Sequence, residues 1–365
     1  MKSSNQMKII QLMKHGEQYS RQDISKLLGI SMPTALRSID ELLEAGIITE
    51  AGSLSSTGGR RAKVFELNKN RGYILALQVT RRHLRMALTD LSGAILHVLK
   101  TRHGYTDDLS WYLEMENLIN GFVSDTQIDP EKIIGAGLSF PGIIDQEKNL
   151  ILHSHVFDIT NIDLDRFYKY IPYPLYVAND ANCACYAEQN QEKDSYLYLS
   201  LNESVGGSIM WKRKLISGTH WRAGETGHVI IHPKGRICYC GKEGCADAYL
   251  STGVLLTEDG ELDTFFDKLD SEDPDSLAVW DCYLDDLALL ISNLNMLLDM
   301  DIVLGGDIGA RMDKYIDDLC LRTKRYDRFS RDVDYIFPCC CKEHIFLTGA
   351  ALGAIDRFDD RLLMD

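Results

Sequence analysis

The chain has 365 residues, of which 45% are hydrophobic and 25% are charged. This length is typical of two or three domains, and the composition is that of an ordinary globular protein. No stretch approaches the roughly 18–20 uninterrupted apolar residues that span a bilayer. The N-terminus also lacks the continuous apolar core and cleavage site of a signal peptide. We therefore expect a cytoplasmic protein with no membrane partner.

The charge is distributed unevenly along the chain. A net charge of −15 argues against nucleic-acid binding by the whole protein. Residues 1–72, however, hold 11 Lys and Arg against 7 Asp and Glu, a net charge of +4, which leaves −19 for the rest. A basic module on an acidic body is able to bind DNA locally while the remainder is repelled.

The N-terminal residues show the pattern of three short helices followed by two strands. Apolar residues recur at helical spacing in three successive segments of residues 5–46. Ser20 and Ser31 are placed to cap the second and third helices, and Pro33 lies in the first turn of the third. Two strands that enclose a polar, glycine-rich loop follow. The pattern predicts a winged helix-turn-helix over residues 1–70.

The third helix of such a domain lies in the major groove of DNA. Thr34, Arg37 and Ser38 are expected on its outer face, where they reach bases or phosphates. Arg60 and Arg61, in the wing, are expected to enter the minor groove or to hold phosphates. The expected partner is operator DNA. The alternative is a three-helix protein-interaction module or a spacer.

The most specific segment reads HVIIHPKGRICYCGKEGC and ends at Cys245. His228, Cys238, Cys240 and Cys245 supply a tetrahedral Cys3His set within a compact loop, which predicts a structural Zn²⁺ site. The site has no open position for a catalytic water. His232 is a rival fourth ligand, and a set of reduced structural cysteines is the alternative to a metal site.

Five motifs then give the chain a clear resemblance to the ROK family of repressors, open reading frames and sugar kinases. The resemblance covers nearly the whole length, and it implies an N-terminal winged helix-turn-helix followed by an α/β actin-like (ribonuclease H-like) two-lobed sugar-kinase fold. The motifs are GLSFPGIID at 137–145, VANDAN at 177–182, AGETGH at 223–228, the cysteine run ending in Asp247, and IVLGG at 302–306.

The strand pattern supports two α/β lobes independently of the resemblance. The first lobe is expected over 71–182, with the C-terminal helix 349–365 packing back on it, and the second, with the zinc loop, over 183–348. A long apolar helix is expected over 284–298, before a strand at 302–304. The other expected strands are 73–79, 83–90, 94–100, 133–138, 175–178 and 196–201.

The resemblance implies a sugar site in the cleft between the lobes, formed by Asn179, Asp180, Glu225, His228 and Asp247. Carboxylates accept hydrogen bonds from vicinal hydroxyls, and His228 is able to show one nitrogen to zinc and the other to the sugar. Asp247 stands where the family has Glu, so its reach is one methylene shorter. For Asn179 and Asp180 alone, a strand-ending turn is the alternative interpretation.

The same resemblance raises the question of kinase activity. In the family's kinases Asp180 would be the general base that activates a sugar hydroxyl for attack on ATP. The first phosphate loop, D-x-G-G-T in the family, reads QVTRR at 78–82, and the second, at 202–208, carries Glu203. Filled space and negative charge where phosphates would lie predict that kinase activity is lost.

We therefore expect a sugar-responsive transcriptional regulator, most often a repressor in this family, acting as a homodimer or higher homo-oligomer on operator DNA. The effector is a sugar or sugar phosphate. Arg81, Arg82 and His83 are able to bind a phosphate on the ligand, or else form a solvent-facing hairpin. Two alternatives remain: an ATP-dependent, glucokinase-like sugar kinase with a regulatory DNA-binding domain, and a constitutive DNA-binding protein whose degenerate kinase domain serves only oligomerisation.

Overall fold

The computed structural model describes residues 4–13, 18–53, 63–190, 193–256, 261–329 and 332–358. The chain divides into two compact units, 1–190 with 346–365, and 191–345. The second unit is therefore an insertion between two parts of the first. A search of the described helices finds none with the length and apolar character needed to cross a membrane.

The N-terminal part of the first unit is a winged helix-turn-helix, as predicted. Ser20 and Asp23 form a reciprocal capping box, and the Ser31 side chain accepts the Thr34 N–H, so both expected caps are confirmed. Gly29 has φ +63 and ends the second helix. The helices are α1 (Ser4–Met13), α2 (Arg21–Leu28) and α3 (Met32–Glu44), and the sheet runs β1 (Tyr19–Ser20), β3 (Lys63–Leu67), β2 (Ile48–Ser53).

The rest of the first unit is built on a five-stranded sheet of order β11-β7-β4-β5-β6. The three strands β4, β7 and β11 are parallel, so their carboxyl ends lie at one edge of the sheet. The strands are β4 (Tyr73–Val79), β5 (Leu84–Thr89), β6 (Ile95–Thr101), β7 (Ile133–Ser139) and β11 (Leu175–Ala178). A smaller sheet holds β8 (Ile143–Asp145), β9 (Leu150–Ser154) and β10 (Ile159–Asp163).

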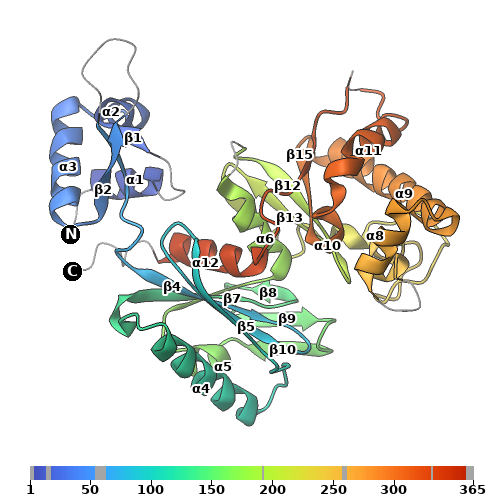
Figure 1. Ribbon diagram of the computed structural model, residues 1–365, viewed down its shortest axis with the longest axis horizontal. Coiled ribbons are helices and arrows are strands. Elements are labelled where there is room, and N and C mark those ends of the chain that lie inside the picture. Colours follow the sequence, from blue (N-terminus) through green and yellow to red (C-terminus); the bar gives the residue numbers. More distant parts are fainter. Residues whose placement is uncertain are drawn as a thin grey trace. The chain divides into compact units, whose positions relative to one another are not determined.

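Both faces of β4 are buried, which explains its continuous apolar sequence. Leu75 and Leu77 pack in a core with helix α4 (Leu109–Asp125), whereas Ile74 and Ala76 pack in a core with helix α12 (Ile345–Arg357). Figure 1 shows α12, drawn in red, lying along the sheet of the first unit. The remaining helical elements of the unit are α5 (Asp165–Tyr168), α6 (Asp180–Ala187), η1 (Pro130–Lys132) and η2 (Glu188–Asn190).

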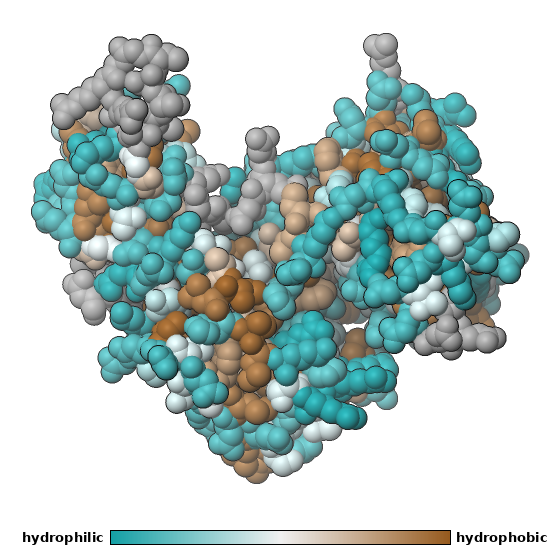
Figure 2. Space-filling view, in the orientation of Figure 1, coloured by the Kyte–Doolittle hydropathy of each residue, from teal (hydrophilic) through white to brown (hydrophobic). Residues whose placement is uncertain are grey.

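The edge strand β6 is exposed along most of its length. Leu96, Val98 and Leu99 are among its exposed residues. Figure 2 shows hydrophobic residues gathered on part of the surface of the first unit, among mainly hydrophilic surroundings. Lys100 is also exposed on this strand, and a charged side chain on an edge opposes pairing with another strand.

The second unit is a five-stranded mixed sheet of order β14-β13-β12-β15-β16. Its strands are β12 (Tyr196–Leu201), β13 (Val205–Trp211), β14 (Lys214–Ile216), β15 (Asp301–Gly305) and β16 (Ile336–Pro338). Its helices are α7 (Asp247–Leu250), α8 (Leu262–Asp270), α9 (Pro274–Leu298), α10 (Gly306–Gly309) and α11 (Ile316–Thr323), with the short 3-10 turns η3 (Thr226–His228), η4 (Thr252–Val254) and η5 (Met312–Tyr315).

Helix α9 is longer than the sequence predicted. It begins at Pro274, because the Asp273 side chain accepts the Ser276 N–H at 2.9 Å and proline is favourable in the first turn. Only its continuous apolar part, 284–298, was expected from the sequence. Trp280 and Tyr283, in the earlier turns, stack 5.1 Å apart in the core of the second unit and secure the extension.

Candidate functional sites

The residues of helix α3 that were expected to contact DNA differ in their exposure to solvent. The Arg37 side chain is 83% exposed, and its Nε donates to Glu41 Oε1 at 2.9 Å. Thr34 is partly exposed, and its hydroxyl lies 2.8 Å from the Ser31 hydroxyl. Ser38 is only 4% exposed, so the predicted outward position is wrong for this residue. It faces inward beside Ile39, because the helical period turns it into the buried stripe.

Two of the expected DNA contacts fall in the wing. Arg60 and Arg61 lie outside the described residues. The described base of the wing is the antiparallel pair β2 and β3, in which Lys63 pairs with Ser53 and donates to Glu50 at 2.7 Å. The wing residues therefore stay a prediction.

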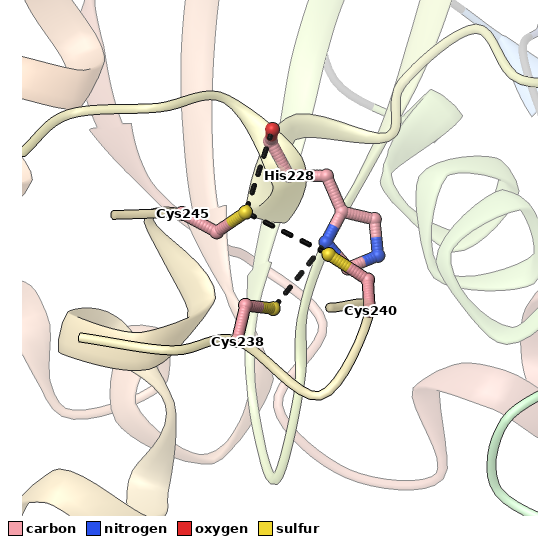
Figure 3. A group of neighbouring side chains, drawn as sticks. All are labelled: His228, Cys238, Cys240 and Cys245. Carbon is pink, nitrogen blue, oxygen red and sulfur yellow. Dashed lines mark hydrogen bonds between the residues drawn. The ribbon is translucent and has the colours of Figure 1, made fainter. Parts of the chain in front are cut away.

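The four expected metal ligands come together in the second unit. The ligand atoms of His228, Cys238, Cys240 and Cys245 all lie within 4.8 Å of one another. Figure 3 shows the three sulfur atoms and the ring of the histidine pointing toward one another. Nδ1 of His228 lies 3.7 Å from Cys238 Sγ, and Cys240 Sγ lies 3.8 Å from Cys245 Sγ. Three soft sulfur ligands and one imidazole are a donor set that suits zinc.

The loop that carries the cysteines depends on glycine. Gly241 and Gly244 have φ of +85 and +80, a conformation that other residues rarely adopt. A Cβ at Gly244 would also lie 1.8 Å from the His232 carbonyl oxygen. The isolated bridges Ile230–Cys245 and Ile237–Glu243 close the loop. Backbone turns and bridges therefore position the four candidate ligands.

The thiols of the cluster influence one another. Burial raises the pKa of Cys238 to about 12. Burial alone would also raise the pKa of Cys240, but the Lys242 backbone N–H and the neighbouring thiols outweigh it and lower that pKa.

His228 faces two ways, as the sequence analysis expected of a shared ligand. Its Nδ1 points to the cysteines, while its Nε2 lies 3.9 Å from Glu225 Oε2 and 3.4 Å from the Tyr239 hydroxyl. Tyr239 was not among the site residues expected from the sequence. Its position between Cys238 and Cys240 is the sequence feature that could have indicated it. The rival ligand His232 instead has its Nε2 2.5 Å from Asp286 Oδ1 and is not in the cluster.

Asp247 follows the cysteine loop and is buried, with 4% exposure. Its Oδ1 accepts the Val205 N–H at 2.6 Å, and burial raises the pKa of its carboxyl to about 6. This bond ties helix α7 to the start of β13. Part of the carboxylate expected to contact sugar is therefore engaged with the backbone.

Asn179 and Asp180 lie in the first unit, at the carboxyl end of β11. The Asn179 side chain caps α6 by accepting the Asn182 N–H at 2.6 Å, as a strand-ending turn requires. Its amide NH2 group is not used by the cap. Asp180 begins the helix, and burial raises the pKa of its carboxyl. Ligands of open α/β sheets bind outside the carboxyl ends of strands, which is where this pair lies.

The two segments expected to correspond to the family's phosphate loops, 78–82 and 202–208, both contain compact turns. Thr80 and His83 close the β4–β5 hairpin, with the Thr80 N–H donating to the His83 carbonyl at 2.9 Å. Glu203 is exposed in the β12–β13 turn. A glycine retained after this turn, Gly207, has a packing reason, because a Cβ there would lie 2.8 Å from the Gly224 carbonyl oxygen. Gly306 likewise has φ +82, which suits the turn after β15.

Comparison with known protein families matches residues 74–354 to the ROK family and residues 2–49 to a winged helix-turn-helix DNA-binding family. Since the ROK match covers more than half of the sequence, this chain belongs to the ROK family, as its motifs indicated.

Among known proteins, the chain is similar to the xylose repressor of Bacillus subtilis (strain 168), with 27% identity over 315 residues that cover 84% of this chain and 78% of that protein. A ROK family transcriptional regulator described as a homolog of E. coli MLC has a TM-score of 0.77 and 21% identity, covering 99% of this chain and 97% of that one. A ROK family glucokinase from Streptomyces griseus, solved with glucose and AMPPNP, has a TM-score of 0.67 and 21% identity, covering 78% and 100%. These structures share the fold.

Proposed function

We propose that this protein is a sugar-responsive transcriptional regulator, acting as a repressor. The winged helix-turn-helix would bind operator DNA, and the ROK domain would bind a sugar or sugar phosphate. The single observation that carries the proposal is the union in one chain of a winged helix-turn-helix and a ROK domain. The similarity to a xylose repressor supports it.

On the DNA side, Arg37 and Thr34 would contact the major groove, and Arg60 and Arg61 the minor groove or the phosphates. The exposure of Arg37 supports this assignment, whereas Ser38 is too buried for a direct contact. Two copies of the chain would bind two half-sites, because operators read by such domains repeat about one helical turn apart. A homodimer is therefore the expected minimum.

On the sugar side, the proposed ligands fall into two groups, Asn179 and Asp180 in the first unit, and Glu225, His228 and Asp247 in the second. His228 Nε2 lies near the Glu225 carboxylate, which supports the assignment of both residues to one ligand site. A structural Zn²⁺ bound by His228 and the three cysteines would orient that ring. For Asp247, the bond to the Val205 N–H limits the role to one carboxylate oxygen.

We also propose that the chain has lost kinase activity. The Thr80–His83 turn is closed on itself, and Glu203 places a negative charge in the second loop. Phosphoryl transfer depends on positioning and charge neutralisation, so such loops would lower the rate by orders of magnitude. The fold shared with a glucokinase makes the test necessary. ATP-dependent phosphorylation of a hexose, abolished in Asp180→Asn, would establish a kinase instead.

The function is tested by measuring binding of the purified chain to the DNA upstream of its own gene, with and without each member of a broad sugar panel. We expect sequence-specific binding that one sugar or sugar phosphate weakens. Binding that no ligand alters, together with no sugar binding in calorimetry, would favour the constitutive DNA-binding alternative. No specific DNA binding at all would refute the regulator.

A further inference from the structure

A row of paired residues crosses the whole sheet of the first unit near its carboxyl edge. Ala178 on β11 pairs with Ser139 on β7, and Ser139 pairs with Gln78 on β4. Gln78 pairs with Arg85 on β5, and Arg85 pairs with Lys100 on β6. Because strands lie about 4.8 Å apart, the backbone distance from the end of β11 to Arg85 is about 14 Å. Residues paired in this way point to the same face.

The far end of this row is a cluster of positive side chains. His83 and Arg102 lie just beyond the ends of β5 and β6, two residues from Arg85 and Lys100, so they continue the same face. Arg82 lies in the turn. Burial lowers the pKa of His83, and the charges of Lys100, Arg85, Arg102 and Arg82 lower it further, as expected if the five side chains gather in one place.

The cluster has few carboxylates to neutralise it in the part of the chain that the structure describes. Across the described ranges, no carboxylate forms an ion pair with Arg82, Arg85, Lys100 or Arg102. This is unusual in a chain with a net charge of −15. Nη1 of Arg85 donates to Gln78 Oε1 at 3.3 Å, whereas its Nε is buried and has no hydrogen-bond partner. A buried N–H donor without a partner is costly, and a bound anion would satisfy it.

The backbone around the cluster is held in place. The Thr80 hydroxyl accepts the His83 N–H at 3.0 Å, which closes the turn. Arg81 Nε donates to the Val156 carbonyl at 2.9 Å, so this arginine points away to β9 and its following loop. A Cβ at Gly104 would lie 2.3 Å from the Arg81 carbonyl oxygen, so residues 102–104 pack directly on the turn. The backbone that carries the cations is therefore held by contacts within the first unit.

We propose that the effector is a phosphorylated sugar whose phosphate is bound by Arg85, Lys100 and Arg102, while Asn179 and Asp180 bind its hydroxyls. The inference rests on the proposed function, and it names the ligand class. Guanidinium groups form paired hydrogen bonds with phosphate oxygens, and lysine adds a point charge. The row of paired residues places both groups near the carboxyl ends of the parallel strands of one sheet, where α/β folds bind small ligands.

DNA phosphates are a different ligand for the same cations. The effector is favoured because the row begins next to Asn179 and lies on the α/β sheet, whereas the recognition helix α3 belongs to the winged helix-turn-helix. Operator DNA is therefore included in the test as a competing outcome.

The test is calorimetric titration of the full chain with glucose, mannose and N-acetylglucosamine, each against its 6-phosphate. We compare the wild type with Arg85→Gln, Lys100→Gln and Lys132→Gln. Lys132 is the matched control, because it is an exposed lysine at the amino end of β7, on the opposite edge of the sheet. We expect one 6-phosphate to bind at least about 10-fold more tightly than its parent sugar. Arg85→Gln and Lys100→Gln should remove that preference, and Lys132→Gln should not.

Equal affinity for a sugar and its 6-phosphate would overturn this inference and leave the proposed function intact. No binding of any of the three 6-phosphates would overturn this inference alone, because the broad sugar panel tests the proposed function separately. Lower affinity of the two variants for operator DNA in the absence of ligand would assign the cluster to DNA. Melting temperatures check that the variants fold. If Arg85→Gln does not fold, Lys100→Gln still decides the test, because Lys100 is exposed.

Discussion

His228 belongs at once to the cluster of candidate metal ligands and to a proposed ligand site, because its two ring nitrogens face different groups. Nδ1 lies 3.7 Å from Cys238 Sγ, and Nε2 lies 3.9 Å from Glu225. A metal bound at Nδ1 would fix the tautomer, so that Nε2 carries the proton and donates. Loss of the metal would therefore change the hydrogen bonds that the ring is able to make.

The cysteines allow a direct test of the metal. We expect about one zinc per chain in the wild type, and loss of that zinc in Cys240→Ser, measured by elemental analysis. Since a structural metal contributes folding free energy, the variant should lose on the order of 3 kcal/mol, or roughly 6–12 °C in Tm. Cys282→Ser, which alters an exposed thiol on α9, should match the wild type. Full zinc content in Cys240→Ser would contradict the assignment.

Arg37 and Ser38 are neighbours with opposite exposure on α3, which makes them a matched pair. Arg37→Ala should weaken operator binding about 10-fold, because it removes an exposed charge that reaches bases or phosphates. Ser38→Ala should leave DNA affinity nearly unchanged, because the buried hydroxyl makes no direct contact. Fluorescence anisotropy with labelled operator measures both. A larger loss for Ser38→Ala would show that α3 docks by another face.

At the scale of elements, helix α12 is the part of the chain that completes the first unit after the second unit has been inserted. Its glycines allow contact at backbone distance: a Cβ at Gly349 would lie 1.5 Å from the Cys183 carbonyl oxygen of α6. On the other side, a Cβ at Gly137 of β7 would lie 2.0 Å from the Ala350 carbonyl oxygen. Helix α12 thus joins α6, which begins at Asp180, to the sheet.

This close packing predicts a large effect from one methyl group. Gly349→Ala should lower the free energy of unfolding by about 3 kcal/mol, because neither backbone segment is able to yield cheaply. Gly121→Ala is the control, because a Cβ at this glycine of α4 would meet open space. Alanine there should raise the free energy of unfolding by about 0.5–1 kcal/mol, since glycine within a helix loses more conformational entropy on folding. Urea unfolding measures both. An unchanged Gly349→Ala would mean that α12 packs differently.

At the scale of the whole molecule, sensing requires that sugar binding and DNA binding favour different states of the chain. If a sugar weakens operator binding by some factor, thermodynamic linkage demands that the operator weaken sugar binding by the same factor. A ligand bound equally by both states would change nothing, however tightly it binds.

This reciprocity is itself a prediction. Titration of the effector in the presence and absence of saturating operator should give an affinity ratio equal to the ratio obtained by titrating operator with and without effector. A coupling of 5–150-fold, about 1–3 kcal/mol, is typical. A ratio of 1 in both titrations would contradict coupling between effector binding and operator binding.

Local secondary structure was largely predictable from the sequence. The caps Ser20 and Ser31 and the strand 73–79 follow from propensity and spacing, and the structure has them at the expected residues. The start of α9 was missed, because its first turns alternate exposed and buried residues instead of forming an apolar run. Ser38 was misplaced because its polar side chain suggested an outer position, although it lies three residues after Ala35 and four before Leu42, the spacing of the buried face.

The sequence by itself determined the grouping of one histidine with three cysteines, the winged helix and the family, because each depends on residue types at short, specific spacing. Only the tertiary structure decided that His228 and not His232 joins the cysteines, and that Asp247 holds the Val205 N–H. It also decided that Arg85 and Lys100 share a row with Ala178. These relations depend on strand register and on loops that bring distant residues together, which local spacing does not encode.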